Sequence, residues 1–441
     1  MLQVTLIAVL TFVPMLLLLV VVHELGHYLT AKWLGVKVLE FGVGYPPRAF
    51  GFYVGNTTVL IDNETQYSNF SDIQHLELGT LIRVYSHEDS TGNLIAQIIL
   101  ASDNKGKFPA LSDGTGRSGN LLQHQGKLRS ADADQIQIAD MLYSINWTPL
   151  GGFVRLAGEN DPCIPKSLAT KPPWARAVIL IAGSAMNAIF PIVVFAIMFM
   201  IPHDVVTGNI MITDVLEGSP ASLAGLKQGD IIVQTNGSQI TTTTDLIRSI
   251  TLDAGTQMRW VIARGALTET ILVTPRVNPP PNEGATGIKI ELVNPTTETR
   301  FQLPWTALIS GVTSSFDMLV LMKKEISRWI GGETQPEFSG PIGIAQITGE
   351  ITTQSGLRGW LMLSILISIN LAILNILPIP MLDGGRLLFV IIEWVRRGKR
   401  IPSEKEGLVH IVGFIVLIGL IIVVSANDIN RLLQGGSLLG G

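Results

Sequence analysis

The segment His23-Glu24-Leu25-Gly26-His27 stands at the end of a long apolar run, because residues 1–22 contain no charged side chain. Residues four apart lie on one face of a helix, so His23 and His27 can bind the same ion. Glu24 occupies the adjacent position, from which a carboxylate can reach a water molecule at that ion. The pattern also occurs by chance in long chains. Inside a spanning helix, however, ionisable groups are costly and mark functional sites. The segment therefore predicts a metal-dependent hydrolase in or at a bilayer.

The composition is that of a membrane protein. Of the 441 residues 47% are hydrophobic and 15% are charged, where a soluble protein has about 25% charged residues. The net charge of −4 gives no indication of nucleic-acid binding. The single cysteine, Cys163, excludes an intrachain disulfide and a cysteine-based zinc site. The apolar N-terminus lacks a basic region and leads into the histidine motif, so we expect a retained span rather than a cleaved signal peptide.

Hydropathy and length predict about four membrane spans. Residues 304–330 have a partial helical stripe followed by charged residues, and we expect an interfacial helix on the outer side. The segment 386–406 is rich in Arg and Lys, which places it in the cytoplasm and both termini outside. The predicted spans cover about 4–34, 175–201, 358–381 and 408–425.

The third metal ligand is predicted to be Asp383. A catalytic zinc ion has three protein ligands and one open position, and Asp383 ends an apolar segment on the same side of the membrane as the histidines. Pro378 and Pro380 interrupt the helix before it, and irregular backbone at membrane depth is tolerated where it lines a cavity. The alternative is that Asp383-Gly384-Gly385 is only a turn that ends a span. With three ligands in place, Glu24 would take the proton of a water molecule and pass it to the leaving amine.

A polar stretch at about 55–147 separates the first two spans. It contains short β-like pieces such as 81–85 and 95–100, which favour a small β-rich cytoplasmic insertion, but its polarity also fits a largely disordered loop. Its histidines, His75, His87 and His124, have no metal-ligand spacing, and we expect them at the surface.

The chain resembles the site-2 protease family of intramembrane zinc metalloproteases, in particular its bacterial branch with a PDZ domain. The resemblance rests on His23–His27 and on Asn375–Gly384, which reads N-x-x-P-x-P-x-L-D-G. Further matches are Pro149–Glu159, Ala182–Asn187 and Gly340–Ile344.

The resemblance implies Zn²⁺ as cofactor, with His23, His27 and Asp383 as ligands and Glu24 as catalytic acid and base. It also implies that Asn187 and Asn375 are active-site groups that contact substrate backbone or the oxyanion. The alternative for these asparagines is a hydrogen bond that packs helices. Pro149–Glu159 resembles a membrane-dipping β-hairpin, whose strand edge could hold an unwound substrate by strand addition, or it is an ordinary hairpin loop.

The pattern Gly218-Ser-Pro-Ala…Ala224-Gly-Leu…Gly229-Asp-Ile-Ile in 205–292 resembles a PDZ domain, which would bind a peptide terminus. The expected fold is a polytopic α-helical membrane protein with about four spans, a membrane-associated β-hairpin and a soluble α+β PDZ domain. The expected regions begin with the first helix and its strand region (1–54), the insertion (55–147), the hairpin (148–173) and the second helix (174–202). They continue with the PDZ domain (203–295), the interfacial helix (296–357), the third span (358–385), the basic loop (386–407) and the fourth helix (408–441).

The family resemblance implies a protease of the bacterial inner membrane. Its partners would be the lipid bilayer and transmembrane substrates, such as anti-sigma factors or remnant signal peptides, and not nucleic acid. Two other classes remain as alternatives. A non-proteolytic PDZ scaffold would have a damaged zinc motif, and here it is intact. A metal transporter would carry acidic or histidine ligands along several spans, whereas the second span has none and the fourth has only His410 before Asp428.

Overall fold

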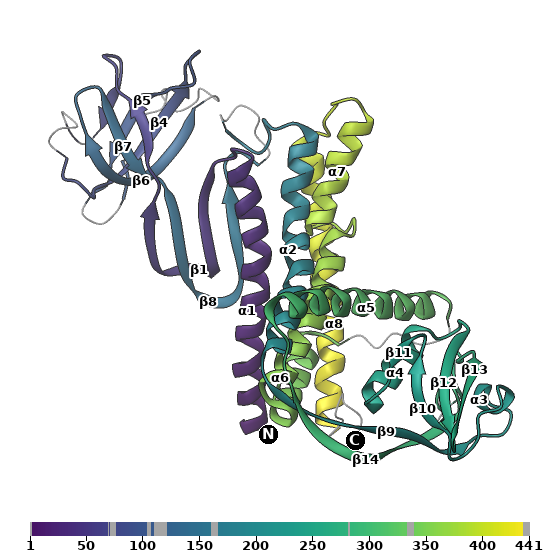
Figure 1. Cartoon of the computed structure of the whole chain (residues 1–441). Coiled ribbons are helices and arrows are strands. Elements are labelled where there is room, and N and C mark those ends of the chain that lie inside the picture. The colour runs from purple at the N-terminus through teal and green to yellow at the C-terminus, as the bar shows by residue number, and fades with distance from the viewer. Residues whose placement is uncertain are drawn as a thin grey trace. The chain divides into compact units, whose positions relative to one another are not determined.

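The computed structural model describes residues 2–434, apart from 69, 71–75, 104–106, 110–120, 160–165, 281–282 and 333–338. His75 and Cys163 lie outside the described residues. The chain forms two compact units, residues 1–190 with 339–441 and residues 191–338. Figure 1 shows the elements of both units.

In the first unit, α6 packs against α1, α7 and α8. The helices of this unit are α1 (Leu2–Trp33), the first part of α2 (Pro173–Met200), α6 (Pro341–Ile376), α7 (Asp383–Val395) and α8 (Ser403–Leu433). Met15 and Leu19 of α1 are buried together with Leu363 of α6. The backbones approach closely at Gly349, where an added Cβ would lie 3.0 Å from Cα of Ala8. Close approach through small residues is typical of membrane helices.

Within the described residues, five helices are long and apolar enough to cross a membrane, where the sequence predicted about four. The additional candidate is α5 (Pro304–Ile330), which we expected to be interfacial, so the number of spans remains a prediction. The segment 386–395, expected in a basic loop, is helical and forms most of α7. The expectation of a loop was wrong because the run Leu387–Ile392 is apolar and gives α7 a side that packs on the unit.

Two long strands follow the zinc-motif helix and precede α2. β1 (Val38–Val54) pairs with β8 (Met141–Leu156), and residues 40–43 of β1 lie beside both 142–145 and 152–155 of β8. The expected local hairpin within 148–173 was wrong, since residues 148–156 pair with β1 instead. One face of this sheet packs on α1, with Phe41, Val154 and Leu156 near Tyr28.

The insertion folds as a small β-barrel, so the β-rich alternative is the one that the structure shows. Strand alternation buries one side of β4, β6 and β7. The order is β2-β7-β6-β4-β5, and a further pairing of Leu60 with Ile95 joins β2 to β5 and closes the sheet. The strands are β2 (Thr57–Leu60), β3 (Gln66–Ser68), β4 (Leu81–Glu88), β5 (Leu94–Ala101), β6 (Leu122–Ala131) and β7 (Gln135–Ala139).

His124 of β6 is fully buried, so its expected surface position was wrong. Its Nε2 lies 2.9 Å from Oγ of Ser86, and its Nδ1 lies 2.8 Å from Oδ2 of Asp140 and also contacts the Lys37 ammonium. Burial lowers the pKa values of His124 and Lys37. Burial would raise the pKa of Asp140, but contacts with His124 and Lys37 outweigh it and hold that pKa well below its usual range. These contacts join the barrel to the chain between α1 and β1.

The second unit contains an antiparallel β-sheet with two short helices and α5. Its strand order is β13-β12-β10-β9-β14, with β11 paired to β10, and Trp260 is fully buried in its core. The PDZ assignment of this region stays a prediction. The elements are β9 (His203–Val215), α3 (Pro220–Leu223), β10 (Ile231–Thr235), β11 (Ser238–Gln239), α4 (Thr243–Leu252), β12 (Met258–Arg264), β13 (Leu267–Val273), β14 (Ile288–Arg300) and α5.

Candidate metal centre

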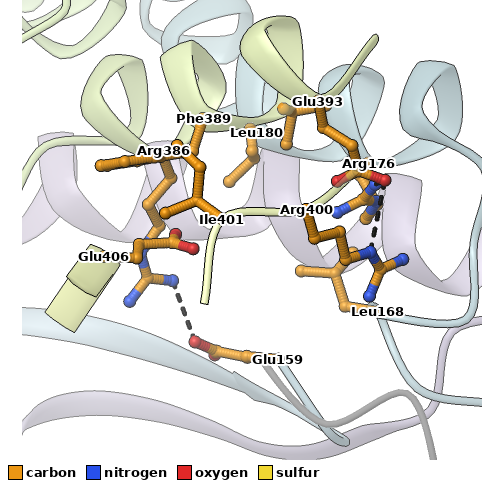
Figure 2. Close-up of a pocket in the computed structure, with 11 residues that line it drawn as sticks. Glu159, Leu168, Arg176, Leu180, Arg386, Phe389, Glu393, Arg400, Ile401 and Glu406 are labelled. Atoms are coloured by element: carbon orange, nitrogen blue, oxygen red, sulfur yellow. Dashed lines mark hydrogen bonds and ion pairs between the residues drawn. The ribbon is translucent and has the colours of Figure 1, made fainter. Parts of the chain in front are cut away.

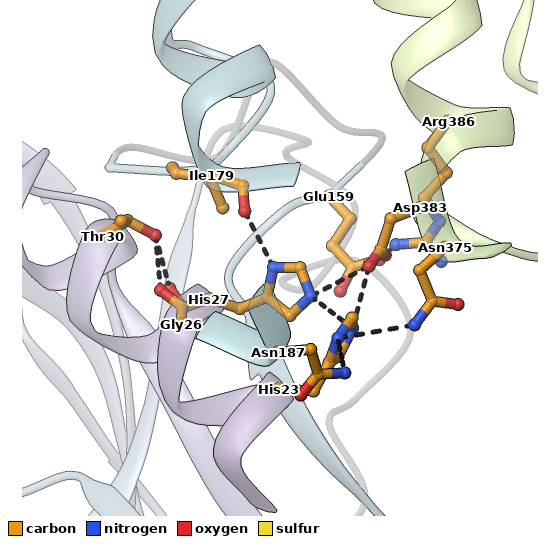
Figure 3. Close-up of polar contacts among 10 residues, drawn as sticks. All are labelled: His23, Gly26, His27, Thr30, Glu159, Ile179, Asn187, Asn375, Asp383 and Arg386. Atoms are coloured by element: carbon orange, nitrogen blue, oxygen red, sulfur yellow. Dashed lines mark hydrogen bonds and ion pairs between the residues drawn. The ribbon is translucent and has the colours of Figure 1, made fainter. Parts of the chain in front are cut away.

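His23, His27 and Asp383 meet at one point, although 356 residues separate the second from the third along the chain. Nε2 of His23 lies 3.0 Å and Nε2 of His27 lies 3.1 Å from Oδ2 of Asp383, and the two nitrogens are 3.2 Å apart (Figure 3). Ligand atoms around a tetrahedral zinc ion are about 3.3 Å apart, given zinc–ligand bonds of about 2.0 Å. The triangle therefore fits a zinc ion with a fourth position open.

The orientation of His27 is set by α2. Its Nδ1–H donates to the backbone carbonyl of Ile179 at 2.8 Å, which leaves Nε2 free to bind a metal. Such a bond from the second ring nitrogen fixes the tautomer of a metal-binding histidine. This contact cannot be recognised in the sequence, because a backbone carbonyl has no residue-type signature.

Asn187 and Asn375 both lie beside Nδ1 of His23, the ring nitrogen that does not contact Asp383. Their Nδ2 atoms are 3.3 Å and 3.4 Å from Nδ1 of His23. A neutral His23 that binds zinc through Nε2 carries its proton on Nδ1 and needs an acceptor there. The Oδ1 atom of Asn187 is buried and has no hydrogen-bond partner among the described residues, and rotation of the amide would offer that oxygen to His23. Both predicted asparagines thus lie next to a predicted ligand.

Asp383 is the first residue of α7, after an irregular segment that follows α6. Two glycines make this turn possible. An added Cβ on Gly384 would collide with the carbonyl of Leu377, and one on Gly385 would collide with the carbonyl of Ile379. The alternative of a turn that only ends a span was wrong, because Asp383, Gly384 and Gly385 begin α7, and their close packing on the preceding segment brings Asp383 beside the histidines.

Glu24 lines a cavity of about 420 Å³ together with His27 and Asp383. Val154 of β8 lines the same cavity as Glu24. Gly152 lies close by, since an added Cβ would be 3.6 Å from Cγ of Glu24. The segment of β8 after Gly151 therefore forms one wall of the cavity at the reactive end of α1.

An ion pair closes another side of the same cavity. Nη1 of Arg386, one turn after Asp383, lies 2.9 Å from Oε2 of Glu159, which follows β8 (Figure 3). Sequence analysis gave neither residue a separate role. The available signals were the basic residue beside the LDG motif and the acidic end of the Pro149–Glu159 segment.

This arrangement is that of a metal-dependent peptidase built among membrane-length helices. The chain belongs to peptidase family M50, whose family model matches residues 11–69 and 134–420. The break between the two matched ranges falls largely on the barrel, which is consistent with an insertion into a shared core.

Characterised relatives match the chain over nearly its whole length. The zinc metalloprotease RasP of Oceanobacillus iheyensis is 30% identical over 96% of this chain and 99% of its own. The regulator of sigma-W protease RasP of Bacillus subtilis is 30% identical over 96% and 98%, and the zinc metalloprotease RasP of Geobacillus kaustophilus is 29% identical over 97% and 99%. The chain is a multi-pass, intramembrane zinc metalloprotease, as the motifs predicted.

Proposed function

We propose that His23, His27 and Asp383 hold the zinc ion and that Glu24 is the catalytic acid and base. The observation that carries this proposal is the triangle of Nε2, Nε2 and Oδ2 atoms with sides of 3.0, 3.1 and 3.2 Å. A bound zinc ion supplies Lewis-acid polarisation of the scissile carbonyl and lowers the pKa of a water molecule to about 7. Glu24 accepts the proton of the attacking water and later donates it to the leaving amine.

The asparagines next to His23 are positioning residues in this proposal. Asn187 is fully buried and fixes the ring of His23. Asn375 is near the end of α6, and its Nδ2 group, which lies 3.4 Å from Nδ1 of His23, can also donate to a substrate carbonyl.

The proposed substrates are single-span membrane proteins that have already been shortened outside the membrane. The relative from Bacillus subtilis is named a regulator of sigma-W protease, so anti-sigma factors are one class, and remnant signal peptides are another. A transmembrane helix hides its peptide bonds and must unwind before cleavage. The edge of β8 beside Glu24 can hold the unwound segment by strand addition.

The turn region of the β1–β8 sheet supports membrane insertion of that sheet. Tyr45, Phe50, Phe52 and Trp147 are all at least half exposed, and Trp147 is 72% exposed. A cluster of exposed aromatic side chains is typical of a surface that contacts lipid. The sheet therefore dips into the bilayer and presents β8 to a substrate at membrane depth.

We further propose an inner-membrane location in a bacterium, with both termini outside and the metal centre toward the cytoplasm. The basic connection at 396–400 supports this orientation.

In α5 the small residues Ala307, Gly311 and Ser315 are buried, while Phe316 and Ile309 are exposed. This favours an interfacial α5. Residues 203–295 of the second unit are the PDZ domain in this proposal and bind a peptide terminus of the substrate.

The test is cleavage of a single-span substrate by the reconstituted, zinc-loaded protein and by its Glu24→Gln variant. We expect cleavage only by the wild type, with equal zinc content in both proteins. Equal cleavage by both would contradict the role of Glu24. Cleavage lost together with zinc would place Glu24 in metal binding instead.

A further inference from the structure

The irregular segment 377–382, between α6 and α7, leads the chain to Asp383. It contains Pro378 and Pro380, which have no backbone N–H to donate. Few hydrogen bonds can therefore form inside the segment, and its conformation depends on contacts with neighbouring helices.

Met381 is the unusual residue of this segment. Its φ of +75° lies in the left-handed region, which a residue other than glycine keeps only where its surroundings fix it. Its backbone N–H donates to Nδ1 of His410 in α8 at 2.9 Å. Met381 also lines the cavity that contains Glu24 and Asp383. A hydrogen bond from α8 thus holds a strained residue in the wall of the active-site cavity, two positions before Asp383.

A second contact joins α8 to the same segment. An added Cβ on Gly413 would lie 2.2 Å from Cβ of Pro380, so the backbone of α8 packs directly on this proline. Residues three apart share one face of a helix, which places His410 and Gly413 side by side. Helix α8 therefore contacts two consecutive residues of the segment, one by packing and one by a hydrogen bond.

The ring of His410 is held between α7 and its own helix. The ring of Phe389 in α7 is 5.6 Å away between centroids, and Nε2 of His410 is buried at 3.8 Å from Oε1 of Glu406. Phe389 and Glu406 also line a neighbouring cavity of about 180 Å³ (Figure 2). Because Nδ1 accepts a hydrogen bond, the neutral ring carries its proton on Nε2. The carboxylate on that side favours this tautomer.

We propose that His410 positions the third metal ligand by accepting the backbone N–H of Met381. Gly384 and Gly385 pack on the carbonyls of the 377–382 segment, so a movement of the segment carries Asp383 with it. Without the hydrogen bond, part of the population holds Asp383 away from the histidines, and the apparent metal affinity falls with the competent fraction. This role rests on the ligand function proposed above for Asp383.

Two amide variants separate the acceptor atom from polarity and size. In His410→Asn the side-chain oxygen can take the place of Nδ1, because both atoms follow Cγ directly, whereas the longer side chain in His410→Gln reaches toward the place of Nε2. His410→Gln should bind zinc about tenfold more weakly, as expected for one lost hydrogen bond, and His410→Asn should stay close to wild type. Competition with a chelator measures the affinity.

The visible spectrum of the Co²⁺-substituted protein is the second measurement, because it reports the geometry of the ligands. It should change in His410→Gln and not in His410→Asn. Gly413→Ala should also weaken zinc binding, since its methyl group would displace Pro380, whereas Gly419→Ala on the same helix has no atom within 4 Å of the added Cβ and should not. Equal zinc affinities and spectra in wild type, His410→Gln and Gly413→Ala would overturn the proposal. Equal losses in the two amide variants would overturn the acceptor role.

The Asp383→Ala variant separates this role from the ligand assignment. Zinc lost in Asp383→Ala but bound normally by His410→Gln would leave the ligand in place and remove the role of His410. Zinc bound at full affinity by Asp383→Ala would overturn the ligand assignment itself, and the role of His410 with it. A lower unfolding temperature in His410→Gln without a change in zinc affinity or spectrum would show that His410 only stabilises the packing of α8.

Discussion

Gly183 of α2 leaves the space that His23 occupies, since an added Cβ at this position would lie 2.6 Å from Nε2 of His23. The same Cβ would be still closer to Nε2 of His27. Real Cβ atoms do not approach other atoms this closely, and both nitrogens belong to predicted zinc ligands. The close packing of α2 on α1 at Gly183 therefore also sets the space that the two histidine rings can occupy.

The Gly183→Ala variant should lose zinc while its helices still form. The methyl group would displace both histidine rings from the ligand triangle. Zinc content by elemental analysis is expected to fall from stoichiometric to background, with unchanged helical circular dichroism. Gly419→Ala is the matched control, because no atom lies within 4 Å of an added Cβ on this α8 glycine. Full zinc content in Gly183→Ala would contradict the assigned centre.

Replacement of Asn187 by Ala should weaken zinc binding without removing a ligand. The side chain is fully buried and touches Nδ1 of His23, and loss of such an outer contact typically lowers metal affinity about 10–100-fold. Competition with a chromophoric chelator would measure the change. If Asn187→Ala keeps its zinc affinity but loses turnover, the asparagine contacts the substrate instead.

Asp428 should stabilise the start of α6. Its Oδ2 accepts hydrogen bonds of 2.9 Å from the backbone N–H groups of Gly340 and Gly343. The Asp428→Ala variant leaves two buried donors without a partner, which costs about 1–3 kcal/mol for each such group. We expect a lower unfolding temperature and faster hydrogen exchange at 340–348. Asp428→Asn retains an acceptor oxygen and should lie closer to wild type; equal losses in both variants would argue against this cap.

The barrel should lose stability in mild acid because of His124. Burial lowers its pKa in the folded state below the value of about 6.5 in an unfolded chain. The unfolded chain thus binds a proton more readily, and the stabilisation present above pH 6.5 is lost as the pH falls through the folded-state pKa. Protonation would also place a second cation beside Lys37 and near Lys166, against the single carboxylate of Asp140.

Limited proteolysis of the barrel between pH 7.5 and pH 5 would measure this effect, with a protease whose activity is calibrated at each pH. Wild type should become more susceptible as the pH falls. His124→Gln should be less stable at neutral pH but less dependent on pH. The same pH dependence in both proteins would assign the effect to other groups.

The sequence indicated the zinc motif, a candidate for the third ligand and most of the long helices, because these depend on local patterns. The spacing of His23 and His27 needs only one helix, and Asp383 could be selected because it is an acidic residue at the end of an apolar segment. Strand alternation within 55–147 favoured β structure for the same reason. Helix α7 was missed and its residues from 386 onward were assigned to a basic loop, because the neighbouring arginines dominated the composition of the segment.

Contacts between distant segments could not be read in this way. The pairing of β8 with β1, the burial of His124 and the carbonyl of Ile179 on His27 all join residues far apart in the chain. A backbone acceptor has no sequence signature, and strand pairing depends on which segments of the chain meet in the folded protein. The sequence by itself determined the chemistry, through residue types at helical spacing. Only the tertiary structure decided the positions of the second-sphere groups and the barrel, because packing sets them.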